Sequence, residues 1–292
     1  MNQFSISQLE RFSGIKAHTI RIWEQRYNAL QPNRSEGNTR YYDNVQLRRL
    51  LNIVSLTNLD YKISELGVMP DKQLFKMVEG LINETQSKTD EYFVSQLIAA
   101  GMGYDELHFD KIFSHCLLRY GMKDTYLKVV YPVLVRTGLM WACDELPPAN
   151  EHFITNLIRQ KLFTAVNALP PPKTNLQSWI LFLPENEFHE IGLLFSHYLI
   201  RLSGKKVIYL GSNVPMQSLI NAVNEISCRN LLLFLVHKDL DEEIHENLNR
   251  LNNHFPGKKI YVAGDKIVLS RIKDVNNITF LSSVEDLEQQ LR

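Results

Sequence analysis

The spacing of apolar residues along the chain changes near residue 170. Between about residues 90 and 169, apolar residues recur every three or four positions, which is the period of a helix with one buried face. Beyond residue 174, short apolar runs alternate with stretches of helical period. The first pattern predicts a helical bundle, and the second predicts an open parallel sheet with helices on both faces.

Four helices make up the predicted bundle, at about residues 90–101, 105–120, 123–143 and 151–169. The apolar stripe of the fourth helix consists of Ile154, Ile158, Leu162, Val166 and Leu169. The stretch Leu169-Pro170-Pro171-Pro172-Lys173 then predicts a stiff linker, because proline cannot continue a helix and favours an extended chain. We place a domain boundary there.

Five strands are predicted beyond this linker, at residues 178–183, 206–210, 230–236, 259–263 and 278–281. The first strand is followed by Glu187-Phe188-His189-Glu190-Ile191-Gly192, at the carboxyl end of a strand, where such sheets bind ligands. A histidine there can coordinate a metal or cofactor, and the carboxylate two residues earlier can orient its ring. The hexapeptide alone is equally consistent with a surface histidine beside a helix start.

The first seventy residues predict a helix-turn-helix followed by a β-wing. Ser5 can cap a first helix, Ser13-Gly14 forms a turn, and a second helix runs from about Ala17 to Tyr27 with Ile20 and Trp23 facing inward. The polar loop of residues 31–42 contains a Gly-Asn turn between two arginines, which is typical of a wing. The exposed face of the second helix presents His18, Thr19, Arg21 and Arg26.

Charge is balanced over the whole chain but not over this segment. The 292 residues contain 32 basic and 32 acidic side chains, so total charge gives no argument for nucleic-acid binding. Between residues 16 and 49 the bases exceed the acids by four: Lys16, Arg21, Arg26, Arg34, Arg40, Arg48 and Arg49 against Glu24, Glu36 and Asp43. This local excess favours DNA contact. Arg48 and Arg49 are also consistent with a merely solvated helix face.

The remaining composition indicates a cytoplasmic protein. Cys116, Cys143 and Cys228 are far apart, which argues against a disulfide framework and a thiolate metal site. No signal pattern precedes Phe4, and the longest apolar run, Leu231–Val236, is too short to cross a bilayer. No membrane partner is expected.

Three motifs in the same order resemble the MerR family of DNA-binding regulators, and more narrowly its cobalamin-dependent photoreceptor branch of the CarH/LitR type. The first runs from Thr19 to Tyr27 and continues with Pro32, Arg34 and residues 37–42, and it is similar to a recognition helix and wing. The resemblance and the residue chemistry together assign DNA contact to His18, Thr19, Arg21, Arg26, Tyr27, Arg34, Asn38, Arg40 and Tyr41.

The other two motifs resemble the parts of these proteins that bind adenosylcobalamin. Trp141, followed by Glu151-His152, resembles the residues that cover the upper face of the cofactor and its adenosyl group. Glu187, His189 and Gly192 match a D/E-x-H-x-x-G pattern, which implies that His189 binds cobalt from below while Gly192 and Gly264 leave room for the nucleotide tail. The alternative role of Trp141 is core packing at a helix end, and that of Glu151 is a first-turn acid favoured by the helix dipole.

The chain departs from the family pattern at three places. Leu235-Val236-His237 stands where Ser-x-Leu usually lines the tail pocket, and Ala263-Gly264 stands in place of Gly-Gly. Ala142 follows the bundle tryptophan, where some members have a histidine that captures cobalt after illumination. These changes affect the expected tail pocket and photoproduct, whereas the expected axial ligand is retained.

The fold class implied is mixed and multi-domain. A winged helix-turn-helix spans residues 1–72, a four-helix bundle spans 73–169, and an α/β Rossmann-like (flavodoxin-like) cobalamin-binding domain spans 174–292. The resemblance implies a non-enzymatic transcriptional regulator, a repressor, controlled by adenosylcobalamin and light. The partners implied are promoter DNA, cobalamin and further copies of the chain in a dimer or tetramer.

Two alternative functions stay open. A regulator of the same architecture that has lost cobalamin binding would be controlled by a protein partner, and the altered tail-pocket positions favour it. A corrinoid-carrying enzyme subunit is the other, but the chain leaves no room for a further catalytic domain of barrel size.

Overall fold

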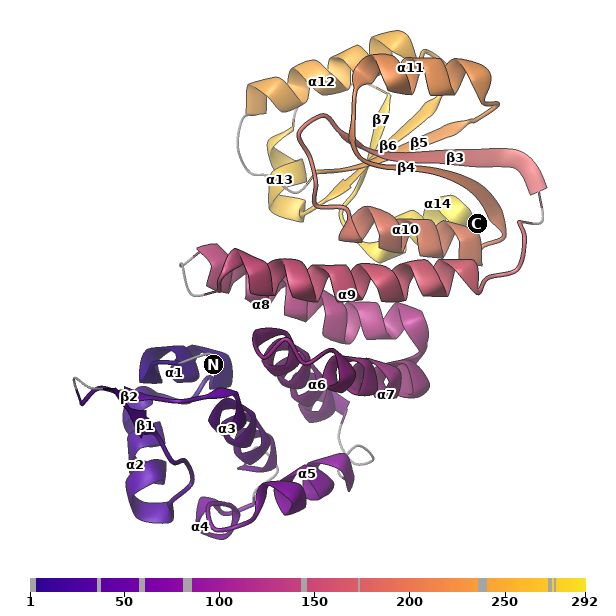
Figure 1. The fold of residues 1–292 in the computed structure, drawn as a ribbon. Helices are drawn as coiled ribbons and strands as arrows, with labels where there is room; N and C mark the ends of the chain where they lie inside the picture. Colours follow the sequence, from indigo (N-terminus) through magenta and orange to yellow (C-terminus); the bar gives the residue numbers. More distant parts are fainter. Residues whose placement is uncertain are drawn as a thin grey trace. The chain divides into compact units, whose positions relative to one another are not determined.

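The computed structural model describes residues 4–35, 38–57, 61–80, 86–142, 146–172, 174–235, 241–272, 275 and 277–292. They form two compact units, Met1–Leu157 and Ile158–Arg292, which are described separately (Figure 1). The division falls inside helix α9 (Pro148–Asn167) rather than in the proline run. The reason is that Arg159 and Phe163, in the second half of α9, contact residues of the sheet domain.

The first unit begins with the helix-turn-helix and wing that the sequence predicts. Ser5 caps α1 in a capping box with Gln8, and Gly14 ends it at a φ of +72°, where a side chain would be strained. Helix α2 has the predicted bounds, and β1 and β2 pair antiparallel as a short wing. The elements are α1 (Ile6–Ser13), α2 (Ala17–Tyr27), β1 (Asn33–Arg34), β2 (Arg40–Tyr41), α3 (Asn44–Thr57), α4 (Ile63–Leu66) and α5 (Asp71–Gly80).

Arg49 links several segments of the N-terminal helix-turn-helix region by hydrogen bonds and is not a solvated side chain. Its guanidinium donates to the carbonyl oxygens of Ala29, Gly67 and Met69 at 2.7–2.8 Å, and it pairs with Asp71 at 2.5 Å. Only 12% of the side chain is exposed. The solvated-face interpretation is therefore wrong for Arg49, because the fold brings three carbonyl groups together around it.

The bundle helices also match the predicted ones. They are α6 (Gln86–Met102), α7 (Glu106–Thr125), a π-helical turn η2 (Tyr126–Val130), α8 (Tyr131–Ala142) and α9. Gly121 has non-helical angles, φ 69° and ψ 174°, so that the run from α7 to α8 divides where the sequence predicts a break. On α9, Ile154, Ile158 and Leu162 are fully buried, which confirms the apolar stripe. Leu169 lies beyond the helix end.

Within this unit, a buried polar contact joins the N-terminal helix-turn-helix region to the bundle. Helix α3 packs on α6, and Gln96 Nε2 donates to Asn52 Oδ1 at 2.9 Å while Gln96 Oε1 lies 2.9 Å from His108 Nε2. Burial, with the nearby Arg48 charge, lowers the pKa of His108 to about 4, so the ring is neutral at pH 7. Arg48 itself pairs with Asp105 at 3.0 Å.

The second unit is a doubly wound parallel sheet, as predicted. In the described residues its strand order is β4-β3-β5-β6-β7, with all strands parallel. From β3 the chain adds β4 on one side and then β5 on the other, so the order of strand addition reverses at β3. Such a reversal is where open α/β sheets bind ligands. The strands are β3 (Thr174–Pro184), β4 (Lys205–Val214), β5 (Asn230–Leu235), β6 (Lys259–Gly264) and β7 (Ile278–Leu281).

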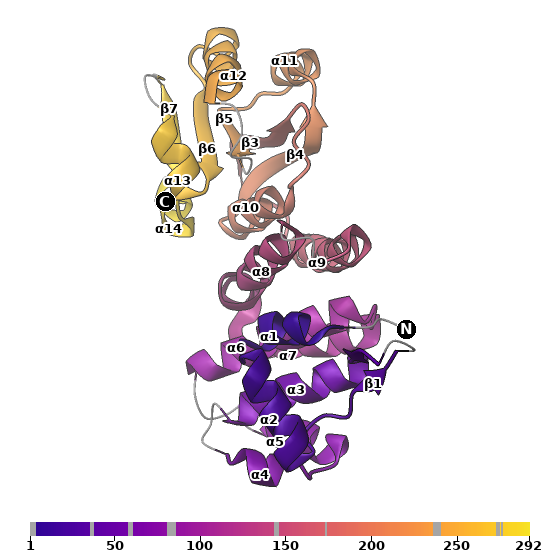
Figure 2. The same cartoon turned by 90° about the vertical axis from the view of Figure 1, so that its left-hand side faces the viewer.

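Helices cover both faces of this sheet (Figures 1 and 2). Leu231, Leu233 and Leu235 of β5 face the core under α11 and α12, so Leu232 and Phe234 face the side of α10 and α14. The alternation places each side chain of β5 unambiguously. The helices are α10 (Ile191–Leu202), α11 (Met216–Glu225), α12 (Asp241–His254), α13 (Lys266–Arg271) and α14 (Val284–Leu291).

Two further expectations concern cysteines and membranes. Cys116 and Cys228 are buried free thiols, and burial raises the pKa of both, so they behave as small apolar residues. Cys143 lies outside the described residues. Among the helices of the described ranges, none is both long and apolar enough to cross a bilayer.

Candidate functional site

The loop between β3 and α10 holds His189 through one buried carboxylate. Glu187 Oε1 accepts hydrogen bonds from the backbone N–H groups of Phe188 and His189, both at 2.8 Å, and lies 2.7 Å from His189 Nδ1. The Glu187 side chain is 9% exposed, whereas that of His189 is 55% exposed. The carboxylate is therefore an internal support, and the imidazole is accessible to a ligand.

The loop is also fixed to the neighbouring strand. Asn213, at the end of β4, accepts from the Asn186 N–H at 2.9 Å through its side chain and donates its own N–H to the Glu187 carbonyl at 3.0 Å. Asn186 and Asn213 both have positive φ, 66° and 54°, which asparagine tolerates better than most residues. These contacts fix the direction in which Glu187 and His189 leave the sheet.

This arrangement suits a metal ligand. When Nδ1 carries the proton and donates to a carboxylate, Nε2 is the unprotonated nitrogen and can bind a metal. A carboxylate in this position also fixes the orientation of the ring. The geometry at Glu187 and His189 thus fits the axial-ligand role that the sequence predicts, and the role itself stays a prediction.

Next to His189, Glu190 joins the loop to the second half of α9. Its carboxylate lies 2.6 Å from Arg159 Nε and accepts a 3.0 Å hydrogen bond from the Tyr209 hydroxyl. Burial, together with the Glu190 charge, raises the pKa of Tyr209, so the phenol stays protonated. His197 stacks on Tyr209 with ring centres 5.2 Å apart. Sequence reasoning missed this cluster because its members come from three separate elements.

Gly192 and Gly264 are closely covered by protein atoms. A Cβ at residue 192 would lie 2.8–3.1 Å from three ring carbons of Phe234, and a Cβ at residue 264 would lie 2.6 Å from the Leu235 carbonyl oxygen. At residue 264 a side chain would collide with the backbone, and at residue 192 it would displace the Phe234 ring, so in this structure the space beside both glycines is filled by protein. The described residues fit a corrinoid at its metal end and do not fit a nucleotide tail passing Gly192 in this arrangement.

The predicted upper-face residues lie in the first unit. Trp141, near the end of α8, is 56% exposed, which excludes core packing as its role in this structure. Glu151 and His152 lie in the first turns of α9 and approach each other at 3.1 Å, with 73% of the His152 side chain exposed. These side chains are accessible, as a ligand contact requires. His237, in the altered tail-pocket segment, lies outside the described residues.

The recognition helix α2 presents the predicted cations to solvent. Arg21, Arg26 and His18 are exposed, while Ile20 is fully buried. Neither Arg21 nor Arg26 has an ion-pair partner among the residues that the structure describes. Thr19 is partly exposed. Exposed cations on a helix after a tight turn are what major-groove contact requires.

Two further residues assigned to DNA have structural contacts. The Tyr27 backbone packs against Gly67 of the α4 end, and Arg40 pairs with Glu24 at 3.2 Å. Glu24 also accepts a 2.8 Å hydrogen bond from Tyr42 and so joins α2 to the wing. Tyr27 and Arg40 therefore support the surface in addition to any contact with DNA.

Within the wing, a side-chain hydrogen bond positions Arg34. Arg34 donates to Asn38 Oδ1 at 2.5 Å, and Asn38 adopts a φ of 60°, as expected in a tight turn. Both side chains are exposed, and Tyr41 is partly exposed. The arginine is thus held across the turn with its charge facing solvent.

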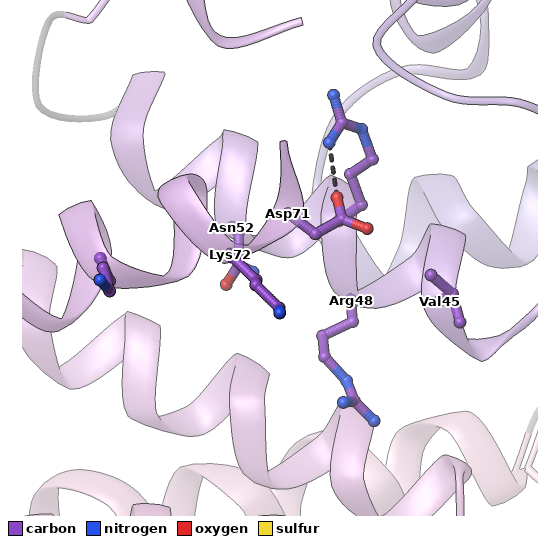
Figure 3. Close-up of a pocket in the computed structure, with 7 residues that line it drawn as sticks. Val45, Arg48, Asn52, Asp71 and Lys72 are labelled. Atoms are coloured by element: carbon purple, nitrogen blue, oxygen red, sulfur yellow. Dashed lines mark hydrogen bonds and ion pairs between the residues drawn. The ribbon is translucent and has the colours of Figure 1, made fainter. Parts of the chain in front are cut away.

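An open pocket of about 450 Å³ lies elsewhere, between α3 and α5 (Figure 3). Its lining residues are Val45, Arg48, Arg49, Asn52, Asp71, Lys72 and Lys76. Two of its four cations are already paired, Arg49 with Asp71 and Arg48 with Asp105. Lys72 and Lys76 are exposed surface lysines. The pocket contains none of the predicted cofactor residues, and it is not the candidate site.

Comparison with known proteins matches two separate regions of the chain. Residues 4–69 match the MerR HTH family regulatory protein model, and residues 93–164 match a B12 binding domain model. The first region is the helix-turn-helix and wing, and the second is the bundle that carries Trp141, Glu151 and His152.

Two repressors are similar to most of this chain. The HTH-type transcriptional repressor CarH of Myxococcus xanthus is 27% identical over 270 residues, which cover 89% of this chain and 88% of CarH. The repressor CarA of the same organism is 25% identical over 244 residues, covering 82% and 78%.

A solved structure supports the fold. The Methanosarcina barkeri monomethylamine corrinoid protein aligns with a TM-score of 0.56 and 14% identity over 69% of this chain and 98% of that protein, a likeness that shows the fold alone. The predicted fold class is confirmed by the domain matches and the parallel sheet. The chain thus contains a MerR-type helix-turn-helix region and a region that matches a B12 binding domain, and it is homologous to the CarH and CarA repressors.

Proposed function

We propose that this chain is a cobalamin-dependent DNA-binding regulator that acts as a repressor and responds to adenosylcobalamin and, through it, to light. The observation that carries the cobalamin part is that Glu187 Oε1 contacts three groups of the His189 loop, namely the backbone N–H groups of Phe188 and His189 and the Nδ1 atom of His189. The exposed Arg21 and Arg26 on α2, together with the matches to CarH and CarA, support the DNA part.

Each residue has a separate task in this proposal. His189 would bind cobalt through Nε2, and Glu187 would keep that nitrogen unprotonated and the ring in place. Trp141 would offer a flat apolar surface to the adenosyl side, and Glu151 and His152 would hydrogen-bond ribose hydroxyls. Bound adenosylcobalamin would supply a cobalt–carbon bond that light can cleave.

Control of DNA binding follows from linkage. A ligand shifts an assembly equilibrium only if it binds the assembled state more tightly than the free chain. We therefore propose that the dark cofactor stabilises a dimer or tetramer whose α2 helices hold DNA, and that illumination removes this stabilisation. Location in the cytoplasm is part of the same proposal.

Reconstitution in darkness tests this function. Full-length protein would be mixed with adenosylcobalamin, separated from free cofactor by gel filtration, and followed by absorbance, oligomer size and promoter gel shift before and after illumination. We expect co-eluting corrinoid with a histidine-bound spectrum, loss of that spectrum in His189→Ala, and weaker promoter binding after light. Absence of corrinoid from the wild-type protein peak would contradict the cobalamin part.

A second candidate function is favoured by one observation, the contact of the Phe234 ring with Gly192. A regulator of this architecture that does not bind cobalamin would be controlled by a protein partner. Its promoter affinity would be the same with and without corrinoid, in darkness and in light. The corrinoid-carrying subunit of an enzyme is a weaker candidate, and methyl transfer from a corrinoid by the isolated chain would support it.

A further inference from the structure

Phe234 is the side chain that closes the space beside Gly192. It is the second-last residue of β5, on the sheet face covered by α10. Three of its ring carbons, Cζ, Cε1 and Cε2, lie 2.8–3.1 Å from the position of a Cβ at residue 192. The outer edge of the ring therefore touches the α10 backbone directly, at the first turn after His189.

The second glycine of the expected tail path is closed as well. At Gly264, the Leu235 carbonyl oxygen and the Leu269 side chain would lie 2.6 Å and 3.4 Å from an added Cβ. The backbone oxygen belongs to the paired strand β5 and is held there by the sheet register, Leu235 opposite Gly264. Of the two closures, only the Phe234 ring can move without breaking the sheet.

We propose that the Phe234 ring sets which corrinoids this chain accepts, by occupying the place that a lower nucleotide tail needs. This inference rests on the proposed function. A corrinoid held by His189 has exchanged its own lower base for the imidazole, so that base and its ribose phosphate must find space beside the loop. A corrinoid without this tail needs no such space. The ring therefore lowers affinity for complete corrinoids relative to tail-less ones.

The cost to a complete corrinoid has a physical origin. Moving the ring away from Gly192 removes a partly buried aromatic side chain from its packing and exposes apolar surface. A shorter side chain at residue 234 would remove this cost and leave a gap beside Gly192. His189 and Glu187 would be unchanged, since none of the three contacts of Glu187 Oε1 involves β5.

Comparison of two corrinoids tests the inference. Full-length wild type, Phe234→Ala and Phe234→Leu would be titrated in darkness with adenosylcobalamin, which has the tail, and adenosylcobinamide, which lacks it. We expect wild type to bind adenosylcobinamide more tightly. Phe234→Ala should raise the affinity for adenosylcobalamin about tenfold, or about 1.4 kcal/mol, with little change for adenosylcobinamide and a smaller gain in Phe234→Leu.

Leu232→Ala is the matched control, since Leu232 lies on the same strand and face, two residues earlier and fully buried. It should leave the ratio of the two affinities unchanged. An unchanged ratio in both Phe234 variants, with both corrinoids bound, would overturn the role of the ring and leave the proposed function standing. Binding of neither corrinoid to any variant would overturn the proposed function and this inference with it.

Discussion

The recognition helix and the sheet-edge loop hold their key side chains in different ways. On α2, Arg21 and Arg26 extend into solvent without ion-pair partners among the described residues. At the sheet edge, His189 is positioned by Glu187, which is nearly buried and accepts three hydrogen bonds on one oxygen. Substitution of Glu187, which supports His189, should therefore strongly reduce ligand binding. On α2, in contrast, Arg21 and Arg26 should each contribute to DNA binding independently.

Glu187→Gln should have the largest effect in this comparison. The amide keeps an acceptor oxygen but loses the charge that supports the imidazole, so we expect corrinoid affinity to fall about 10- to 100-fold. Spectral titration with adenosylcobinamide measures this without the tail contributing. Glu185→Gln is the matched control, because Glu185 is an exposed carboxylate of the same loop. Equal affinities in the two variants would show that the buried carboxylate does not support the histidine.

Arg21→Ala should have the next largest effect, on DNA. If Arg21 reads a base edge, its loss should weaken promoter binding by about 1–3 kcal/mol and relax the base preference at one position. Gel shifts with the promoter and single-base variants measure both. Lys206→Ala, which removes an exposed charge from the sheet domain, is the control. A wild-type pattern of base preference in Arg21→Ala would remove this residue from the reading surface.

The sequence predicted well what depends on local pattern. Helix α2, the wing and the five strands follow from periodicity and turn residues, and Glu187 and His189 are close in the chain, so their contact could be expected. The sequence could not show which elements, far apart in the chain, come into contact in the fold. The Arg49 side chain is only 12% exposed because three carbonyl groups surround it, and Phe234 faces Gly192 because β5 lies beside α10. Neither convergence leaves a local signal.

Arg34→Ala should have a smaller effect that is uniform across DNA sequences. Arg34 lies on the wing with its charge exposed, and a phosphate contact there would release about one counterion. We therefore expect the slope of log affinity against log salt to become shallower by about 0.9. Asn38→Ala removes the neutral partner of Arg34 and keeps the charge, so its salt slope should stay near that of wild type. A wild-type slope in Arg34→Ala would argue against a phosphate contact.

The smallest effect concerns His197, which contrasts with His189 because it is a packed rather than an accessible histidine. Burial, with the nearby Arg201 charge, lowers the pKa of His197 to about 4, and Tyr209 stacks on its ring. An unfolded histidine has a pKa of about 6.5, so between pH 4 and 6.5 the unfolded state binds more protons. The free energy of unfolding should therefore fall as pH is lowered through this window and stay level above it.

Thermal melting of the whole chain between pH 5 and 7 measures this dependence, since the lowered carboxyl pKa values of Glu10 and Asp286 act at lower pH. His197→Gln cannot gain a proton, so its melting temperature should decline less with falling pH than that of wild type, by about 2–4 °C. His108, whose pKa is also lowered to about 4, keeps part of the dependence in that variant.

Because His197 supports packing rather than a ligand, His197→Gln should retain the histidine-bound corrinoid spectrum that His189→Ala loses. Loss of that spectrum in both variants would mean that the α10 packing, and not only Glu187, positions the candidate ligand.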